Sequence, residues 1–143
     1  MDKNLVASKS IEINTKPEKV WEVLTNPQKI KEYLFGTETS TDWEVGSPIL
    51  FQGKFKGQVY KDKGNVLEKI ENKFLKYNYW SGFSGLEDKP ENYALVTYQI
   101  DNISDGKIKF TWVQQGFSSK EGQCHTEEGL VVMLEHIKKL AEE

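Results

Sequence analysis

The chain has little of what several large classes of protein depend on. Its 143 residues include one cysteine, Cys124, so no disulfide framework can form within it, and a reducing, cytoplasmic compartment is expected. No apolar run approaches a membrane-spanning length, and the N-terminal segment MDKNLVASKS lacks the apolar stretch of a secretory signal. The net charge is −3, and the 19 basic residues are scattered among 22 acidic ones without a stripe that could neutralise phosphates. We therefore expect neither nucleic acid nor membrane as a partner.

The composition is that of a folded domain. Hydrophobic residues make up 37% of the chain and charged residues 29%, values typical of a globular protein. The length is sufficient to bury a core without disulfides or metals. No linker, internal repeat or low-complexity tract divides the sequence, so we predict a single domain over residues 1–143.

Two helix-start signals follow a first predicted strand that contains Ile11 and Ile13. Residues 15–18 read Thr-Lys-Pro-Glu, a capping box in which the Thr15 hydroxyl would accept from a free amide of the first turn. Asn26-Pro27 repeats the start signal almost at once, and Gly36 is the predicted stop. Apolar residues at helical spacing give the two helices their inner faces: Val20, Trp21, Val23 and Leu24, then Ile30, Tyr33 and Leu34.

Strand signals dominate residues 43–117. Turns are predicted at residues 62–64, 71–73 and 104–106, with a longer loop over residues 81–91. Short turns between successive strands indicate an antiparallel meander. From Thr126 onward, a helical stripe predicts an amphipathic helix whose apolar side must lie on the sheet, with Glu135, Lys138, Lys139 and Glu142 facing water. The stripe consists of Leu130, Leu134, Ile137 and Ala141.

The order and spacing of these motifs resemble the START-like or Bet-v-type helix-grip superfamily, also known as SRPBCC. More narrowly, they resemble the domain shared with activators of the heat-shock-protein-90 ATPase. The matching pieces cover nearly the whole chain: Ile11-x-Ile13, Pro17-x-x-Val20-Trp21, Asn26-Pro27, and residues 41–47, 62–67, 76–79 and 90–98. Relatives often carry a Gly-Trp pair before the closing helix, where this chain has Gly129-Leu130, a change that would remodel a cavity wall.

The fold class expected from the pattern and the resemblance is α+β. A curved antiparallel sheet would wrap around a long C-terminal helix, and the two short helices after the first strand would close one end.

The cysteine, histidine and glutamate residues near the closing helix do not form a recognisable catalytic or metal-binding motif. A catalytic thiolate needs a base within hydrogen-bond reach, but sequence neighbours such as Cys124 and His125 point away from each other in a strand or a helix. Together with Glu127 and Glu128, this pair also lacks the ligand spacings of zinc sites. We therefore predict no catalytic residue, no metal and no cofactor.

The aromatic residues are numerous for so small a domain, and most of them are expected to form solid core. A curved sheet around one helix can nevertheless leave a cavity, with Tyr hydroxyls, Thr97, Thr111 and Gln114 as its polar groups. A one-residue bulge would exchange the faces of a strand, so the inward parity stays open. The predicted cavity wall is Trp21, Tyr33, Phe51, Phe55, Tyr79, Tyr98, Trp112, Leu130 and Leu134.

The leading hypothesis is a non-enzymatic binding protein that holds a small lipophilic or aromatic ligand between sheet and closing helix. The resemblance alone implies an alternative, a stress-related or co-chaperone-like domain with a chaperone or other protein partner. Residues 80–86 could serve either role as a gate or a contact, although we expect this loop to pack down over the sheet edge. An enzyme is a third possibility that lacks a reacting group with a credible partner.

Overall fold

A computed structural model describes residues 1–143 apart from the side chain of Phe55. In this described part the chain forms a seven-stranded antiparallel sheet with the order β1-β7-β6-β5-β4-β3-β2. The strands are β1 (Asp2–Ile13), β2 (Glu38–Ser40), β3 (Pro48–Phe55), β4 (Gln58–Ile70), β5 (Phe74–Tyr79), β6 (Ala94–Ser104) and β7 (Lys107–Phe117). Helices α1 (Pro17–Thr25) and α2 (Pro27–Tyr33) follow β1, and α3 (Lys120–Glu142) closes the chain. The predicted α+β class is confirmed.

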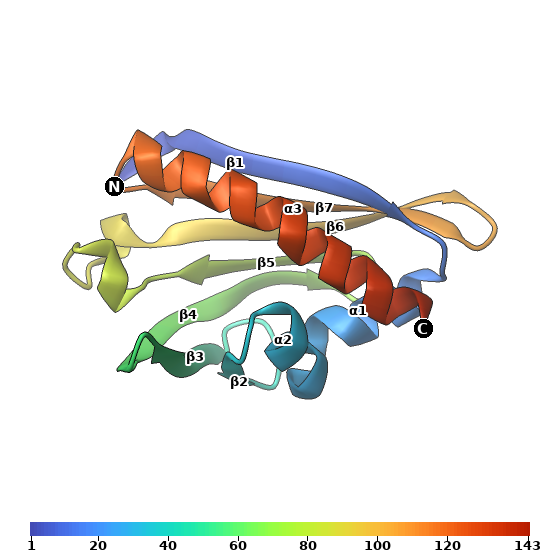
Figure 1. Cartoon of the computed structure of the whole chain (residues 1–143), viewed down its shortest axis with the longest axis horizontal. Helices are drawn as coiled ribbons and strands as arrows, with labels where there is room; N and C mark the ends of the chain where they lie inside the picture. Colours follow the sequence, from blue (N-terminus) through green and yellow to red (C-terminus); the bar gives the residue numbers. More distant parts are fainter.

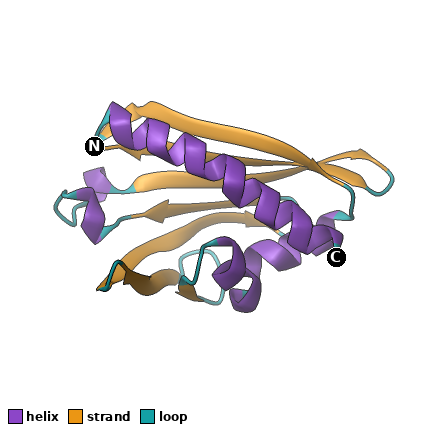
Figure 2. Cartoon of the chain, viewed as in Figure 1, coloured by secondary structure: helices purple, strands orange, loops and turns teal.

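Helix α3 crosses one face of the sheet obliquely and ends beside α1, while α1 and α2 lie together at one end (Figure 1). Short 3-10 turns at η1 (Gly82–Ser84) and η2 (Pro90–Asn92) mark the opposite end, as Figure 2 shows. The predicted stripe of α3 is buried as expected, since Leu130, Ile137 and Ala141 are at most 1% exposed. Within the described residues, no helix combines the length and the apolar character needed to cross a membrane.

The two helix starts predicted near the N-terminus have different outcomes. Asn26 caps α2 as expected, because its side chain accepts from the Gln28 amide at 2.9 Å. The capping box at Thr15 is wrong: Lys16 occupies the N-cap of α1, and no side chain bonds to the free amides there. Pro17 in the first turn starts the helix without that bond, since its fixed φ is already helical.

Helix α3 begins six residues earlier than the predicted Thr126. Ser119 is its N-cap, and the Ser119 hydroxyl accepts from the Gly122 amide at 3.1 Å. The first turns carry almost no buried apolar residue, so the helical stripe could not reveal them. Gly129 therefore lies in the middle of this helix rather than before it.

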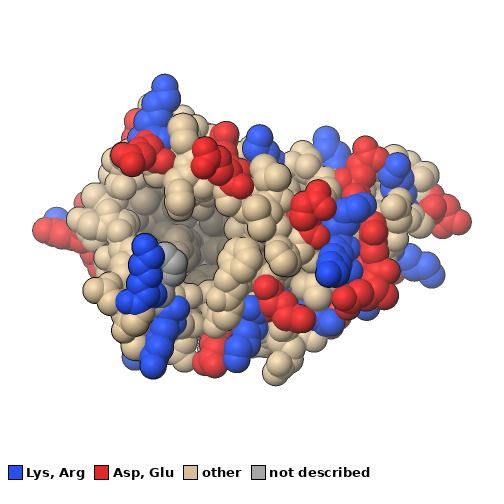
Figure 3. Space-filling model, in the orientation of Figure 1, with Lys and Arg blue, Asp and Glu red and all other residues tan. Residues whose placement is uncertain are grey.

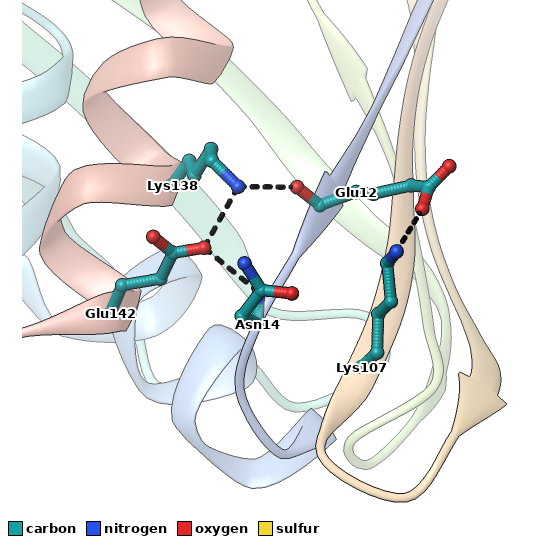
Figure 4. Close-up of polar contacts among 5 residues, drawn as sticks. All are labelled: Glu12, Asn14, Lys107, Lys138 and Glu142. Atoms are coloured by element: carbon teal, nitrogen blue, oxygen red, sulfur yellow. Dashed lines mark hydrogen bonds and ion pairs between the residues drawn. The ribbon is translucent and has the colours of Figure 1, made fainter.

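The C-terminal end of α3 is tied to β1 by side chains that were expected to face water (Figure 4). The Lys138 ammonium donates to the backbone oxygen of Glu12 and to the Glu142 carboxylate, both at 2.8 Å. The same Glu142 oxygen accepts from the backbone amide of Asn14 at 2.8 Å. These bonds, first with Lys138 and then with Asn14, hold the pKa of Glu142 below its ordinary value. The contacts fix the helix at the end of the sheet that is remote from η1.

The turn predicted at residues 62–64 is wrong, because β4 runs straight through it. The hairpin turns instead at Lys56 and Gly57, whose φ angles of +50° and +81° suit a two-residue turn between β3 and β4. Gly64 has a different purpose: a Cβ there would lie 1.8 Å from the backbone oxygen of Asn78 on β5. The glycine permits a close approach of two backbones, and it does not mark a chain reversal.

Candidate functional site

A pocket of about 430 Å³ lies between the inner face of the sheet and the N-terminal half of α3. Figure 3 shows the corresponding hollow to the left of centre, in the same orientation as Figure 1. Strands β3 to β7 provide its floor and one wall, and α3 provides the facing wall through Thr126, Gly129 and Met133. Its apolar lining includes Leu34, Phe51, Tyr77, Val96, Trp112 and Met133.

The floor of the pocket is a continuous row of aromatic rings that crosses the sheet. Phe51 on β3 meets the rings of Tyr77 and Tyr79 on β5, with centroids 6.0 and 5.8 Å away. Tyr77 contacts Tyr98 on β6 at 5.5 Å, and Tyr98 contacts Trp112 on β7 at 4.5 Å. Such pairs contribute roughly 0.5–1.5 kcal/mol each beyond their buried area. The row therefore gives the pocket a rigid, apolar base.

Two phenols of this row, Tyr77 and Tyr98, are hydrogen-bonded to each other. The hydroxyl oxygens of Tyr77 and Tyr98 lie 2.7 Å apart, and both side chains are buried. Burial raises the pKa of Tyr77 and of Tyr98 above the ordinary value for a phenol. Both groups therefore stay protonated at neutral pH.

Asp62 is the acidic residue of the lining, and it projects inward from β4 with only 6% of its surface exposed. One carboxylate oxygen, Oδ2, accepts from the Tyr79 hydroxyl at 2.5 Å. The other oxygen, Oδ1, is buried and has no hydrogen-bond partner among the described residues. Burial, together with the charge of Asp62, raises the pKa of Tyr79 well above its ordinary value, so Tyr79 remains the donor.

Polar groups also meet at the edge of the pocket near α2. The Thr37 hydroxyl donates to the Leu34 backbone oxygen at 2.9 Å and lies 2.6 Å from the Tyr60 hydroxyl. Because the Thr37 proton is directed to Leu34, Tyr60 donates to Thr37. Gly53 leaves the space for this phenol, since a Cβ there would lie 2.7 Å from the Tyr60 oxygen.

The loop before η2 reaches the mouth of the pocket. Phe83 lines the pocket, is 55% exposed and contacts the Tyr60 ring at 5.7 Å. The loop is held locally: the Ser81 hydroxyl accepts from the Phe83 amide, and the Trp80 indole donates to the Leu86 oxygen. Trp80 and Leu86 are partly buried, but the expectation that the loop packs its apolar residues down is wrong for Phe83.

The residues predicted for the cavity wall divide into three groups. Phe51, Tyr79 and Trp112 line the pocket. The side chain of Phe55 lies outside the described residues. The remaining residues are buried in the core and are not part of the pocket lining: Trp21, Tyr33, Tyr98, Leu130 and Leu134.

The polar groups expected in the cavity are only partly there. Gln114 lines the pocket, whereas Thr97 and Thr111 sit at the opposite strand parity from the inward Tyr98 and Trp112. Asp62 was not among the predicted lining residues, because residues 62–64 were expected to form a turn. The alternation of inward Tyr60, Asp62, Gly64 and Val66 along β4 was the signal that could have found it.

The neighbours Cys124 and His125 differ in their position relative to the pocket. Cys124 is a free, exposed thiol outside the pocket lining, whereas His125 is part of that lining. The described residues contain no group of three or more His, Cys, Asp or Glu side chains arranged to hold a metal ion.

Comparison with known proteins places this geometry in a family. A sequence profile described as Activator of Hsp90 ATPase homolog 1-like protein matches residues 14–142. The solution structure of ChR145 from Cytophaga hutchinsonii is 39% identical, with a TM-score of 0.83 over 99% of this chain and 97% of that one. Among functionally curated proteins, no sequence matches.

Two more distant structures share the fold. One is the solution structure of the Aha1 dimer from Colwellia psychrerythraea, at 18% identity and a TM-score of 0.74, with 96% of each chain covered. The other is PFC0360w, an HSP90 activator from Plasmodium falciparum, at 13% identity and a TM-score of 0.74, with 95% of each chain covered.

Proposed function

The chain belongs to the Activator of Hsp90 ATPase homolog 1-like family, and we propose that it is a non-enzymatic binding protein. Its ligand is a small lipophilic or aromatic molecule, held in the pocket between the sheet and α3. The observation that carries this proposal is the open pocket of about 430 Å³ with its floor of aromatic rings. Ligand sites commonly have volumes of roughly 300–1,000 Å³ and mostly apolar linings with a few polar groups.

The absence of an enzymatic role is supported by the chemistry of the lining. Burial raises the pKa of Tyr77 and of Tyr79 and keeps both protonated, and the Tyr79 hydroxyl donates to Asp62. Among the described lining residues, no serine or threonine hydroxyl is hydrogen-bonded to His125 or Asp62. A hydroxyl without such a base is a weak nucleophile.

A pair of variants on opposite sides of α3 tests the proposal. Gly129→Leu directs a side chain into the pocket, whereas Val131→Leu enlarges a residue that is 52% exposed and outside the lining. Both variants and the unmodified protein are screened by thermal shift against a panel of naphthalene and indole compounds. We expect compounds that raise the melting temperature of the unmodified protein and of Val131→Leu, but not of Gly129→Leu. A panel without any binder, or binders indifferent to Gly129→Leu, would contradict the proposal.

A second candidate function is binding to an Hsp90-type chaperone, which the family membership favours. The exposed Phe83 ring offers an apolar contact beside the pocket mouth. Titration with a purified chaperone tests this role, with Phe83→Ser as the weakened variant. Ile103→Ser, which alters a residue 49% exposed in β6, is the control. If the chaperone does not bind the unmodified protein, this role is excluded. If both variants bind it equally well, Phe83 is excluded as the contact.

A further inference from the structure

Asp62 indicates which class of ligand the pocket selects. We propose that the pocket accepts a lipophilic or aromatic amine, and that its protonated nitrogen donates to the Asp62 carboxylate. This inference rests on the proposed function, since it specifies the ligand of the same pocket. It is carried by the buried Oδ1 of Asp62, which has no hydrogen-bond partner among the described residues.

Few groups of the protein stabilise the buried carboxylate of Asp62. A buried carboxylate is unfavourable unless it is paired or well hydrogen-bonded, yet Asp62 has one neutral donor, the Tyr79 hydroxyl. Asp62 belongs to none of the ion pairs formed by the described residues. The adjacent Lys63 is exposed at the opposite strand parity and pairs with Asp88 instead. A cation from outside the chain would supply the missing partner.

The surroundings of Asp62 suit an amine attached to an apolar body. Phe51 lies directly opposite Asp62 in the β3–β4 register, and Tyr79 contacts both of them. Aromatic faces attract cations through their ring quadrupoles, and a nearby carboxylate adds a charged acceptor. One placed charge in an otherwise aromatic pocket is how such sites orient a ligand.

A series of four compounds with the same ring system tests the inference. The compounds are naphthylethylamine, naphthylethanol, ethylnaphthalene and naphthylacetate, with affinities measured by isothermal titration on the whole chain at neutral pH. We expect the amine to bind about tenfold or more tightly than ethylnaphthalene, because a hydrogen bond to a charged group contributes that much. Naphthylacetate should bind most weakly, since its carboxylate would meet Asp62.

The outcomes separate the two proposals. Equal affinities for the amine and ethylnaphthalene overturn the inference about Asp62 but leave the apolar binding function intact. Failure of the whole series to bind, together with a thermal-shift panel that gives no binder, overturns both.

Two variants test whether the preference for the amine comes from the Asp62 carboxylate. Asp62→Asn should abolish the advantage of the amine while ethylnaphthalene binds as before. Tyr79→Phe removes the hydroxyl that donates to Asp62. The amine should therefore keep or increase its advantage in affinity over ethylnaphthalene. Loss of the advantage in Tyr79→Phe would assign the contact to the phenol and overturn the inference. If Asp62→Asn does not fold, as judged by circular dichroism, the compound series on the unmodified protein still decides the matter.

Discussion

Gly129 offers the most informative single substitution, because it lies inside α3 and lines the pocket. A Cβ at this position would meet no heavy atom within 4 Å apart from the helix's own backbone. Glycine in a helix interior is less stable than alanine by about 0.8–1 kcal/mol. Gly129→Ala should therefore raise the free energy of unfolding by about that amount, or raise Tm by roughly 3 °C for a domain of this size.

Gly129→Leu extends the same reasoning into the cavity. It should gain a similar helix-propensity term and roughly 1 kcal/mol more, because part of the leucine side chain leaves water against the pocket wall. Urea unfolding followed by tryptophan fluorescence gives both free energies, with an unchanged m value as the sign that the same transition is measured. The gain in stability should be accompanied by a loss of ligand binding.

Gly122→Ala is the matched control for both variants. Gly122 belongs to the first turn of α3, and its Cβ would lie 3.4 Å from the Ser119 hydroxyl. It is not a lining residue, so this substitution should leave ligand affinity unchanged.

Destabilisation by Gly129→Ala would refute the reasoning, since it would mean that the space beside Gly129 is already filled.

Two further predictions concern the frame around the pocket. Glu142→Gln should reduce the free energy of unfolding near neutral pH. Because the folded-state pKa of Glu142 is lowered from 4.5, the difference between the two proteins should persist down to about pH 5.5. It should disappear as the pH falls below 4.5 and through the folded-state pKa. Urea unfolding as a function of pH measures this difference, and a gap that persists in acid would contradict it. Gly64→Ala should cost roughly 3 kcal/mol or more, since its Cβ would overlap the Asn78 oxygen, whereas Gly82→Ala meets nothing within 4 Å and should be nearly neutral. Equal free energies of unfolding for these two variants would disprove the close-approach argument.

Local signals predicted those elements whose boundaries depend on neighbouring residues. Asn26-Pro27 identified the start of α2 because the cap bond links residues two positions apart. The start of α3 escaped prediction because Ser119 is followed by turns without a buried stripe. Gly64 was misread because a glycine after Asp and Lys is equally compatible with a turn and with the close approach of another strand. Only the pairing of β4 with β5 separates these alternatives.

The candidate site was less predictable than the fold. Apolar residue type and a place in a predicted strand or helix selected Phe51, Tyr79 and Trp112, which line the pocket. The same criteria selected Tyr98 and Leu134, which pack solidly instead, because filling a cavity depends on distances between elements remote in sequence. Asp62 was overlooked because residues 62–64 were expected to form a turn, although the alternation along β4 could have predicted its burial. The missing hydrogen-bond partner of Oδ1 becomes visible only in the structure.

The central claim is that a lipophilic ligand binds between the sheet and α3. The most direct measurement is a titration of isotope-labelled protein with naphthylethylamine, followed by amide chemical shifts. We expect the shifted amides to cluster in residues 60–62, 77–83 and 125–133, which surround the pocket. Amides that do not shift, or shifts confined to the outward-facing residues of β6 and β7, would contradict it.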